Sequence, residues 1–428
     1  MSNQEIIRRE QYCQIVNEIT GSDQYMVVGI DVGKDKHHAF VGTARGICLF
    51  KKLIFENNLE GFDRFLAIVD QLKSQSCLEK IVYGLEPTGN YHKPLARHLI
   101  RCGRNVVFVA GQAVKNNRQL LDGRWDKNDT KDAANVADLV SRGKCLYYDC
   151  PSPEINELRG LLSLRRRLKR EEHSLRMRIR NNLLAQYFPE MDKFYNSCES
   201  ESLAIVKWCL DPDKVSVMEF DEFFNMVTRT RRGIEQMRRL RHIHHLAVES
   251  VGCPMGSAAE YEAALLVEKR QQVAIQIQET ADLIKDICLE LPEYKYLLTI
   301  PGFGPYISAK VLAAIGDPFR FDNRKQVIKM SGFDLSANRT GKTAKKAVPV
   351  ISKKGNGELR YALYQAAHIA ASRTDLFRAY FTKILRGRER ERGIKTKMRV
   401  KLAAKMLVIA WTLMKTKQSF DPGHLNID

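Results

Sequence analysis

Short apolar runs separated by polar turns fill the first third of the chain. Runs rich in valine, isoleucine and tyrosine that are bounded by glycine or proline predict buried strands, and apolar positions repeated every three or four residues predict helices. The expected order is strand 25–31, strand 37–43, strand 47–54, helix 58–73, strand 80–86, helix 91–102, strand 105–110 and helix 129–142. This pattern predicts an α/β domain over residues 25–147.

Long helical patterns follow in the middle of the chain. Two apolar seams lie there, one of Leu158, Leu161, Leu164, Leu168 and Leu175, and one of Leu266, Val273, Ile277, Ile284 and Ile287. Their spacing predicts an antiparallel coiled coil, a contact across a dimer, or two plain core helices. Residues 188–250 between them are interpreted as a helical insertion without an assigned function.

The last part of the chain contains the segment LLTIPGFGPYISAKVLAAIG at residues 297–316. Gly302 and Gly304 between apolar helical stretches predict a helix-hairpin-helix, whose backbone N–H groups can hold a phosphate. A tight helix–helix turn with close packing would use the same glycines. The expected organisation is an extension over 1–24, the α/β domain, a helical coiled-coil spacer over 148–291, and a mostly helical domain over 292–428.

Four acidic residues stand at the predicted edge of the sheet. Asp31 ends the apolar run YMVVGID, Glu86 ends IVYGLE, and Asp129 and Asp132 lie one helical turn apart. Ligands gather beyond the carboxyl ends of parallel strands, and four packed carboxylates need cations, so the pattern predicts two Mg²⁺ or Mn²⁺ ions. Two such ions clamp the oxygens of a phosphoryl displacement. The alternative is ordinary surface acids at strand ends and a helix start.

The charge of the chain narrows the class of substrate. With 69 Lys and Arg against 50 Asp and Glu, the formal charge of +19 predicts a polyanionic partner. No apolar run reaches the roughly 20 residues that span a bilayer, and the first residues lack the layout of a signal peptide, so we expect a cytoplasmic protein that binds no membrane. Ten cysteines without a CxxC pair predict reduced thiols rather than a zinc ribbon.

Basic residues and hydroxyl groups collect in two places. A long basic helix contains Arg165, Arg166 and Arg167, and a Gly- and Thr-rich loop is followed by a helix that starts near Asn356 or Gly357. The cations expected at this loop and helix are Lys342, Lys345, Lys346, Lys353, Lys354 and Arg360. Hydroxyls such as Ser336 and Thr340 lie beside these lysines, whose charge could stabilise a phosphorane-like transition state. The alternative is a loop that is simply flexible and cationic.

Three leading strands followed by alternation with helices is the order of an RNase H-like fold. The segments GIDVGKDKH, YGLEPTGNYHKPLA, KNDTKDAANVADL, IPGFGPYISAKVLAAIGD and TGKT with ISKKGNGELRYALYQAA occur in one order along the chain. This order resembles the DEDD transposases of bacterial insertion sequences, which are related to the Piv invertase. The resemblance covers residues 26–147 and 292–415.

The resemblance implies a RuvC-like nuclease domain, a C-terminal domain that supplies a nucleophilic serine, and recombination of DNA guided by a structured noncoding RNA. By position, Asp31, Glu86, Asp129 and Asp132 match the DEDD metal ligands. Where the family has Ser before Gly, this chain has Thr340, so the nucleophile is expected to be Thr340, with nearby Ser336 as the alternative. Holding two DNA segments implies a dimer or tetramer.

Two other functions fit the same residues. A RuvC-like junction or structure-specific nuclease would use the acids with water as its nucleophile. A noncatalytic nucleic-acid-binding protein would use only the basic helices and the helix-hairpin-helix.

Overall fold

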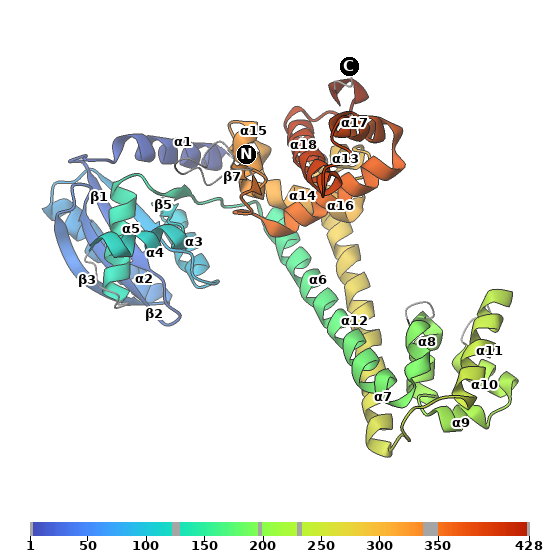
Figure 1. Ribbon diagram of the computed structural model, residues 1–428. Helices are drawn as coiled ribbons and strands as arrows, with labels where there is room; N and C mark the ends of the chain where they lie inside the picture. Colours follow the sequence, from blue (N-terminus) through green and yellow to red (C-terminus); the bar gives the residue numbers. More distant parts are fainter. Residues whose placement is uncertain (1–2, 122–128, 196–198, 229–232, 337–349, 426–428) are drawn as a thin grey trace, which may run out of the picture. The chain divides into compact units, whose positions relative to one another are not determined.

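The computed structural model describes residues 3–121, 129–195, 199–228, 233–336 and 350–425. The chain divides into two compact units, Met1–Cys150 and Pro151–Asp428. Figure 1 shows the helices and strands of each unit.

A six-stranded mixed sheet forms the centre of the first unit. Its strands are β1 (Tyr25–Asp31), β2 (Lys36–Thr43), β3 (Cys48–Glu56), β4 (Lys80–Leu85), β5 (Asn105–Phe108) and β6 (Leu146–Tyr147), in the order β3-β2-β1-β4-β5-β6. Strands β1, β4 and β5 are parallel, while β2, β3 and β6 pair antiparallel with their neighbours. The sequence therefore predicted the α/β class and strands β1 to β5 correctly.

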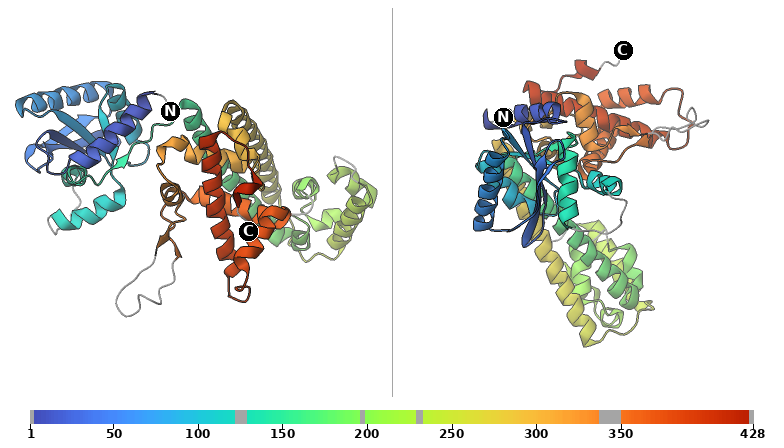
Figure 2. Two further views of the ribbon diagram at one scale, coloured as in Figure 1. Left: turned by 90° about the horizontal axis from the view of Figure 1, so that it is seen from above. Right: turned by 90° about the vertical axis from the view of Figure 1, so that its left-hand side faces the viewer.

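Helices cover both faces of this sheet (Figure 2). One face packs against α2 (Leu59–Gln75) and α3 (His92–Arg101), and the other against α1 (Asn3–Glu18), α4 (Gly111–Leu121) and α5 (Asp129–Ser141). Side chains alternate along a strand, so Met26, Val28 and Ile30 face the first layer and Tyr25 and Val27 the second. Helices α1 and α4 had not been predicted as parts of the domain.

Two long antiparallel helices open the second unit. They are α6 (Pro153–Arg178) and α12 (Ser257–Glu290), which lie side by side (Figure 1). The start of α6 shares a core with the end of α12, where Leu158 and Ile284 lie, and the end of α6 shares a core with the start of α12, where Leu175 and Leu266 lie. The predicted seams thus meet within one chain.

A small helical bundle, called the tip subdomain here, joins the far ends of α6 and α12. Its described helices are η1 (Ile179–Leu184), α7 (Ala185–Tyr187), η2 (Pro189–Lys193), α8 (Glu199–Trp208), α9 (Pro212–Ser216), α10 (Phe220–Val227) and α11 (Ile234–Val248). Phe223, Leu240 and Ile243 are fully buried in its core, which continues into α6 and α12. The insertion expected at residues 188–250 is therefore helical, as predicted.

The rest of the second unit is mostly helical, as the sequence predicted. Its elements are α13 (Pro292–Leu298), α14 (Pro305–Ile315), η3 (Pro318–Arg320), α15 (Arg324–Ser331), β7 (Leu335–Ser336), β8 (Val350–Ile351), α16 (Gly357–Arg373), α17 (Asp375–Leu385), α18 (Ile394–Thr416) and η5 (Pro422–Leu425). The Asn356 side chain accepts a hydrogen bond from the Leu359 N–H and so caps α16, whose start had been predicted. None of the described helices is long and apolar enough to cross a membrane.

Candidate catalytic site and nucleic-acid-binding surfaces

Asp31 and Glu86 lie at the carboxyl ends of neighbouring parallel strands. Asp31 is the last residue of β1, and Glu86 follows β4 directly. Ile30 is paired with Leu85 in the register of the two strands, and each acid is the residue directly after one member of this pair. The edge of a sheet beyond its parallel strands is where α/β proteins bind ligands. The structure thus brings these two predicted acids to one edge.

Helix α5 packs on the sheet directly beneath this edge, and two glycines allow its close approach. A Cβ on Gly29 would lie 2.2 Å from the Ala133 carbonyl oxygen, and a Cβ on Gly84 would lie 2.5 Å from a methyl carbon of Val140. Asp31 is two residues beyond Gly29 on β1, so the alternation of the strand places both on the α5 side. The Glu86 side chain lies against Gly111, at the start of α4.

Asp132 lies one residue before Ala133 on α5 and is buried. Its side chain is 3% exposed, and Arg118 of α4 binds it through Nη2 at 2.6 Å from Oδ1. The Arg118 Nε donates a second hydrogen bond to the same oxygen, at 2.9 Å. The carboxylate is therefore neutralised by a cation of the chain itself.

A network of side-chain amides continues this contact between α4 and α5. The Asn117 amide donates hydrogen bonds of 2.7 Å to Asn135 and to Asp138, and the Asn135 amide donates one of 2.7 Å to the Val114 carbonyl. Buried polar groups are costly unless each finds a partner. These contacts therefore fix the position of α4, and with it Arg118, against α5.

The fourth acid, Asp129, is the first residue of α5, and its side chain lies outside the described part of the structure. Among the described residues, no group of three or more carboxylate, imidazole or thiol side chains is arranged to hold a metal ion. The donors at the edge are carboxylate oxygens, which is the ligand chemistry that Mg²⁺ and Mn²⁺ prefer. Asp31 and Glu86 fit such an ion in chemistry and placement, whereas Asp132 already has Arg118 as its counter-ion.

The two candidate nucleophiles belong to the second unit. Ser336 is exposed in β7, opposite Val350 of β8. Thr340 lies outside the described residues, as do Lys342, Lys345 and Lys346. Beyond β8, the Ser352 hydroxyl donates a hydrogen bond of 2.6 Å to Asp334, and the predicted cations Lys353 and Lys354 are exposed.

The glycines between α13 and α14 have different surroundings. Gly302 has a φ of 91°, and a Cβ there would lie 2.7 Å from the Ala366 carbonyl oxygen, so this glycine permits close packing on α16. Gly304 caps α14 and has no atom within 4 Å of a Cβ position. The segment at Gly304 and the first turn of α14 is therefore the part of the turn that can approach a phosphate.

Cations surround Tyr306 in the first turn of α14. The Arg165 guanidinium lies 4.1 Å from the ring centroid and the Lys310 ammonium 4.6 Å from it. Arg166 and Lys310 both pair with Glu358, at 3.5 and 3.6 Å. Parts of α6, α14 and α16 thus form one basic surface.

The remaining predicted cations differ in their roles. Arg167 is exposed on α6, whereas Arg360 donates a hydrogen bond of 2.8 Å from Nη1 to the Ser331 carbonyl and so ties α16 to α15. The sequence had pointed to neither Arg118 nor Tyr306. Arg118 lies on a helix that the apolar pattern did not predict, while Tyr306 could have been found as an aromatic residue directly after the glycine turn.

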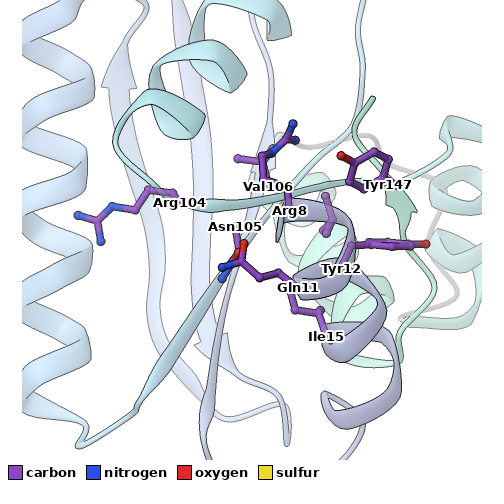
Figure 3. A pocket seen from close by; sticks show the side chains of 9 residues that line it. Arg8, Gln11, Tyr12, Ile15, Arg104, Asn105, Val106 and Tyr147 are labelled. Atoms are coloured by element: carbon purple, nitrogen blue, oxygen red, sulfur yellow. The ribbon is translucent and has the colours of Figure 1, made fainter. Parts of the chain in front are cut away.

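The first unit also contains a small pocket. It lies between α1 and β5, lined by Arg8, Gln11, Tyr12, Ile15, Arg104, Asn105, Val106, Val107 and Tyr147 (Figure 3). Its volume of about 10 Å³ admits roughly one water molecule. This pocket is therefore too small for a substrate, and the candidate site stays at the edge of the sheet.

An α/β unit with acids at its strand ends, joined to a basic helical unit in a chain of charge +19, is typical of a protein that processes nucleic acid. Two family models match the chain: the DEDD transposase model of IS110, described as transposase, over residues 28–189, and the transposase family IS116/IS110/IS902 over residues 294–382. The chain belongs to this family of transposases. The family makes it an enzyme that acts on DNA.

Curated relatives agree with this assignment. An uncharacterized 44.8 kDa protein of insertion element IS116 from Streptomyces clavuligerus is 23% identical, over 92% of this chain and 96% of the relative. The mini-circle putative transposase for IS117 from Streptomyces coelicolor is 22% identical over 68% of this chain and 71% of its own length. A probable family 20 transposase from Pseudomonas aeruginosa is 23% identical over 81% of this chain and 87% of its own length.

Proposed function

We propose that this protein is the recombinase of an insertion sequence, which cuts and rejoins DNA strands by Mg²⁺-dependent transesterification. The observation that carries the proposal is the placement of Asp31 and Glu86 one residue beyond the paired Ile30 and Leu85, on the face that α5 covers. An RNase H-like (RuvC-like) fold of the first unit is part of the proposal. The strand order β3-β2-β1-β4-β5, with β2 antiparallel to both its neighbours, supports it.

The four acids would share the task of holding the cations. Asp31 and Glu86 offer oxygens from the strand ends, Asp129 stands at the start of α5, and Asp132 becomes a ligand when Arg118 releases it. Two Mg²⁺ or Mn²⁺ ions bound there would lower the pKa of an attacking hydroxyl and offset the charge of the leaving oxygen. The buried position of Asp132 limits the access of water to this carboxylate.

The reaction needs a hydroxyl from the second unit, and Thr340 or Ser336 would supply it. Its oxygen forms a bond to the phosphorus and loses its proton, while the bond from phosphorus to one strand oxygen breaks and that oxygen takes up a proton. The strand is then joined to the protein by a phosphodiester, so its bond energy is kept for religation. Attack by a second strand reverses the step without ATP.

The basic surface of the second unit would hold the backbones of the substrates. Gly304 at the start of α14, Arg166 and Arg167 on α6, and the lysines that flank the β7–β8 pair would contact phosphates. Base pairing to a structured noncoding RNA would then choose the DNA sequence, and a dimer or tetramer would hold two DNA segments. The charge of +19 supports binding of both polyanions.

Neutral variants of the strand-end acids test the metal site. Asp31→Asn and Glu86→Gln should abolish cleavage of DNA that carries the element ends in Mg²⁺, while binding of the same DNA in EDTA survives. Asp23→Asn is the matched control, because Asp23 is exposed and pairs with Arg45. Normal cleavage by the two site variants would show that these acids play no part in cleavage and would overturn the proposal. A parent protein that binds this DNA without cleaving it would instead be a noncatalytic nucleic-acid-binding protein.

Trapping of the protein on labelled DNA tests the nucleophile. Peptide mapping should find the phosphodiester on Thr340 or Ser336, and the alanine variant of that residue alone should form no adduct. Cleavage without any adduct in the parent protein would identify a nuclease that uses water. An adduct on a different residue would reject both hydroxyls.

A further inference from the structure

Most of the tip subdomain lies between the two stretches of the chain that the family models match. The family models match residues 28–189 and 294–382, and helices α8 to α11 fall between them. Helix α12 has 34 residues, so it is about 50 Å long and separates this subdomain from the helices of the C-terminal part. None of the residues proposed for strand cleavage lies in the tip subdomain.

Charge is unequally distributed along this part of the chain. Residues 185–227 contain nine acids and three lysines, whereas the segment TRTRRGIEQMRRLRHIHH over 228–245 contains six arginines, three histidines and one acid. Most of this basic segment forms α11. Such segregation is typical of a surface that contacts a polyanion.

One face of α11 is exposed and mixes apolar with basic side chains. Ile234 is 77% exposed, Met237 45% and Val248 64%, while Leu240 and Ile243 on the other side of the helix are fully buried. The exposed side chains line a hollow of about 440 Å³, formed by Ile234, Met237, Arg238, Arg241, His242 and His245. The spacing of these residues by three and four places them along one stripe of the helix.

The arginines of α11 divide into two groups. Arg239 lies 3.8 Å from the buried Glu201 of α8, which also accepts a hydrogen bond from Gln236, so Arg239 helps to anchor α11 in the bundle. Arg241 lies on the exposed stripe, 4.9 Å from the centroid of the Phe220 ring. Arg238 pairs with Glu235 at 2.7 Å, but both side chains are more than 70% exposed, so this pair contributes little and gives way readily to a phosphate.

We propose that the exposed stripe of α11 is a second DNA-binding surface, which lies in the major groove of a DNA duplex and pairs with its phosphates. The 15 residues of α11 give a rod about 22 Å long, and a major groove about 12 Å wide admits an α-helix. Arg238 and Arg241 contact the backbone, and Ile234 and Met237 contact sugars and thymine methyl groups. The major groove of A-form RNA is too narrow for side chains to read, so the stripe selects DNA.

Binding in EDTA tests this surface separately from the proposed metal chemistry. The full chain is titrated with a labelled 30-bp DNA duplex at several salt concentrations. The double variant Arg238→Gln/Arg241→Gln should bind about tenfold more weakly, and the slope of log K against log salt should fall by about 1.8, for two lost phosphate contacts. The charge-preserving Arg238→Lys/Arg241→Lys should restore most of that slope.

Two controls come from the same subdomain. Lys207→Gln on α8 removes an exposed charge outside the stripe and should leave affinity and slope unchanged. Arg239→Gln should lower the melting temperature, because it leaves Glu201 buried with a weaker partner. An unchanged slope in the double glutamine variant would overturn the proposal. An equal loss of affinity and slope in Lys207→Gln would also overturn it. So would tighter binding of the stripe to an RNA duplex of the same sequence than to the DNA duplex. A parent protein that binds DNA but does not cleave it would count only against the proposed function.

Discussion

The buried carboxylate of Asp132 on α5 binds the guanidinium of Arg118 on α4, with Nη2 at 2.6 Å and Nε at 2.9 Å from the same oxygen. An isolated carboxylate at 3% exposure would carry a large desolvation cost, and the guanidinium offsets that cost. A metal ion held as proposed through Asp132 would therefore compete with Arg118 for this carboxylate.

Removal of Arg118 should expose this competition. Arg118→Gln leaves Asp132 buried without its counter-ion, so we expect a loss of about 3 kcal/mol in unfolding free energy in EDTA. Added Mg²⁺ should restore much of that loss and raise the melting temperature of the variant more than that of the parent. The matched control is Arg45→Gln, which breaks the exposed pair with Asp23. Equal Mg²⁺ shifts in the variant and the parent would argue against Asp132 as a metal ligand.

The contact between α5 and the sheet predicts a strong effect of a single methyl group. Gly29→Ala would place its Cβ 2.2 Å from the Ala133 carbonyl oxygen, so α5 must move away from β1. We expect a loss of about 2 to 3 kcal/mol in unfolding free energy, together with weaker catalysis because Asp132 moves with α5. Gly160→Ala in α6 meets no atom within 4 Å and should instead stabilise its helix, by about 1 kcal/mol. Chemical denaturation followed by circular dichroism measures both changes.

The sequence predicted the parts of the fold that rest on apolar periodicity. Strands β1 to β5 and helix α5 have buried β-branched or apolar faces, and their predicted bounds agree with the structure within two residues. Helix α4 was missed because it offers few apolar contacts, Val114 and part of Ala113, while Asn117 and Arg118 make polar contacts with α5. Apolar periodicity alone does not show a helix that is held in large part by hydrogen bonds and an ion pair.

Only the part of the candidate site that lies on the strands could be predicted from the sequence. Strand order and the rule for strand ends were sufficient to bring Asp31 and Glu86 together. The partner of Asp132 could not be predicted, because it depends on how α4 packs. The sequence could not decide between a phosphate-binding turn and a tightly packed turn between α13 and α14. The structure shows that Gly302 packs on Ala366, while Gly304 faces open space.

His37 predicts a loss of stability in mild acid. The imidazole is fully buried beside Phe55 and Phe62, and this burial lowers the pKa of His37. Below about pH 6.5 the unfolded chain takes up a proton that the folded chain refuses, so stability falls as the pH drops from 7 to 5. His37→Phe should flatten this part of the profile, measured by urea denaturation. His173→Gln, at an exposed position of α6, is the control, and an equally steep profile in His37→Phe would refute this role.

Arg165 and Arg167, two residues apart on α6, should separate an effect on stability from an effect on DNA binding. Arg165 stacks 4.1 Å from the centroid of the Tyr306 ring, so Arg165→Ala removes a cation–π contact between α6 and α14 and should lower the unfolding free energy by about 1 kcal/mol. Arg167 is exposed and forms no ion pair with the described residues, so Arg167→Ala should leave the melting temperature unchanged. Its effect should appear in DNA binding, where one lost phosphate contact reduces the salt slope by about 0.9. The opposite assignment of the two effects would show that Arg165, and not Arg167, carries the contact with DNA, because a guanidinium stacked on tyrosine can still donate hydrogen bonds from its edge.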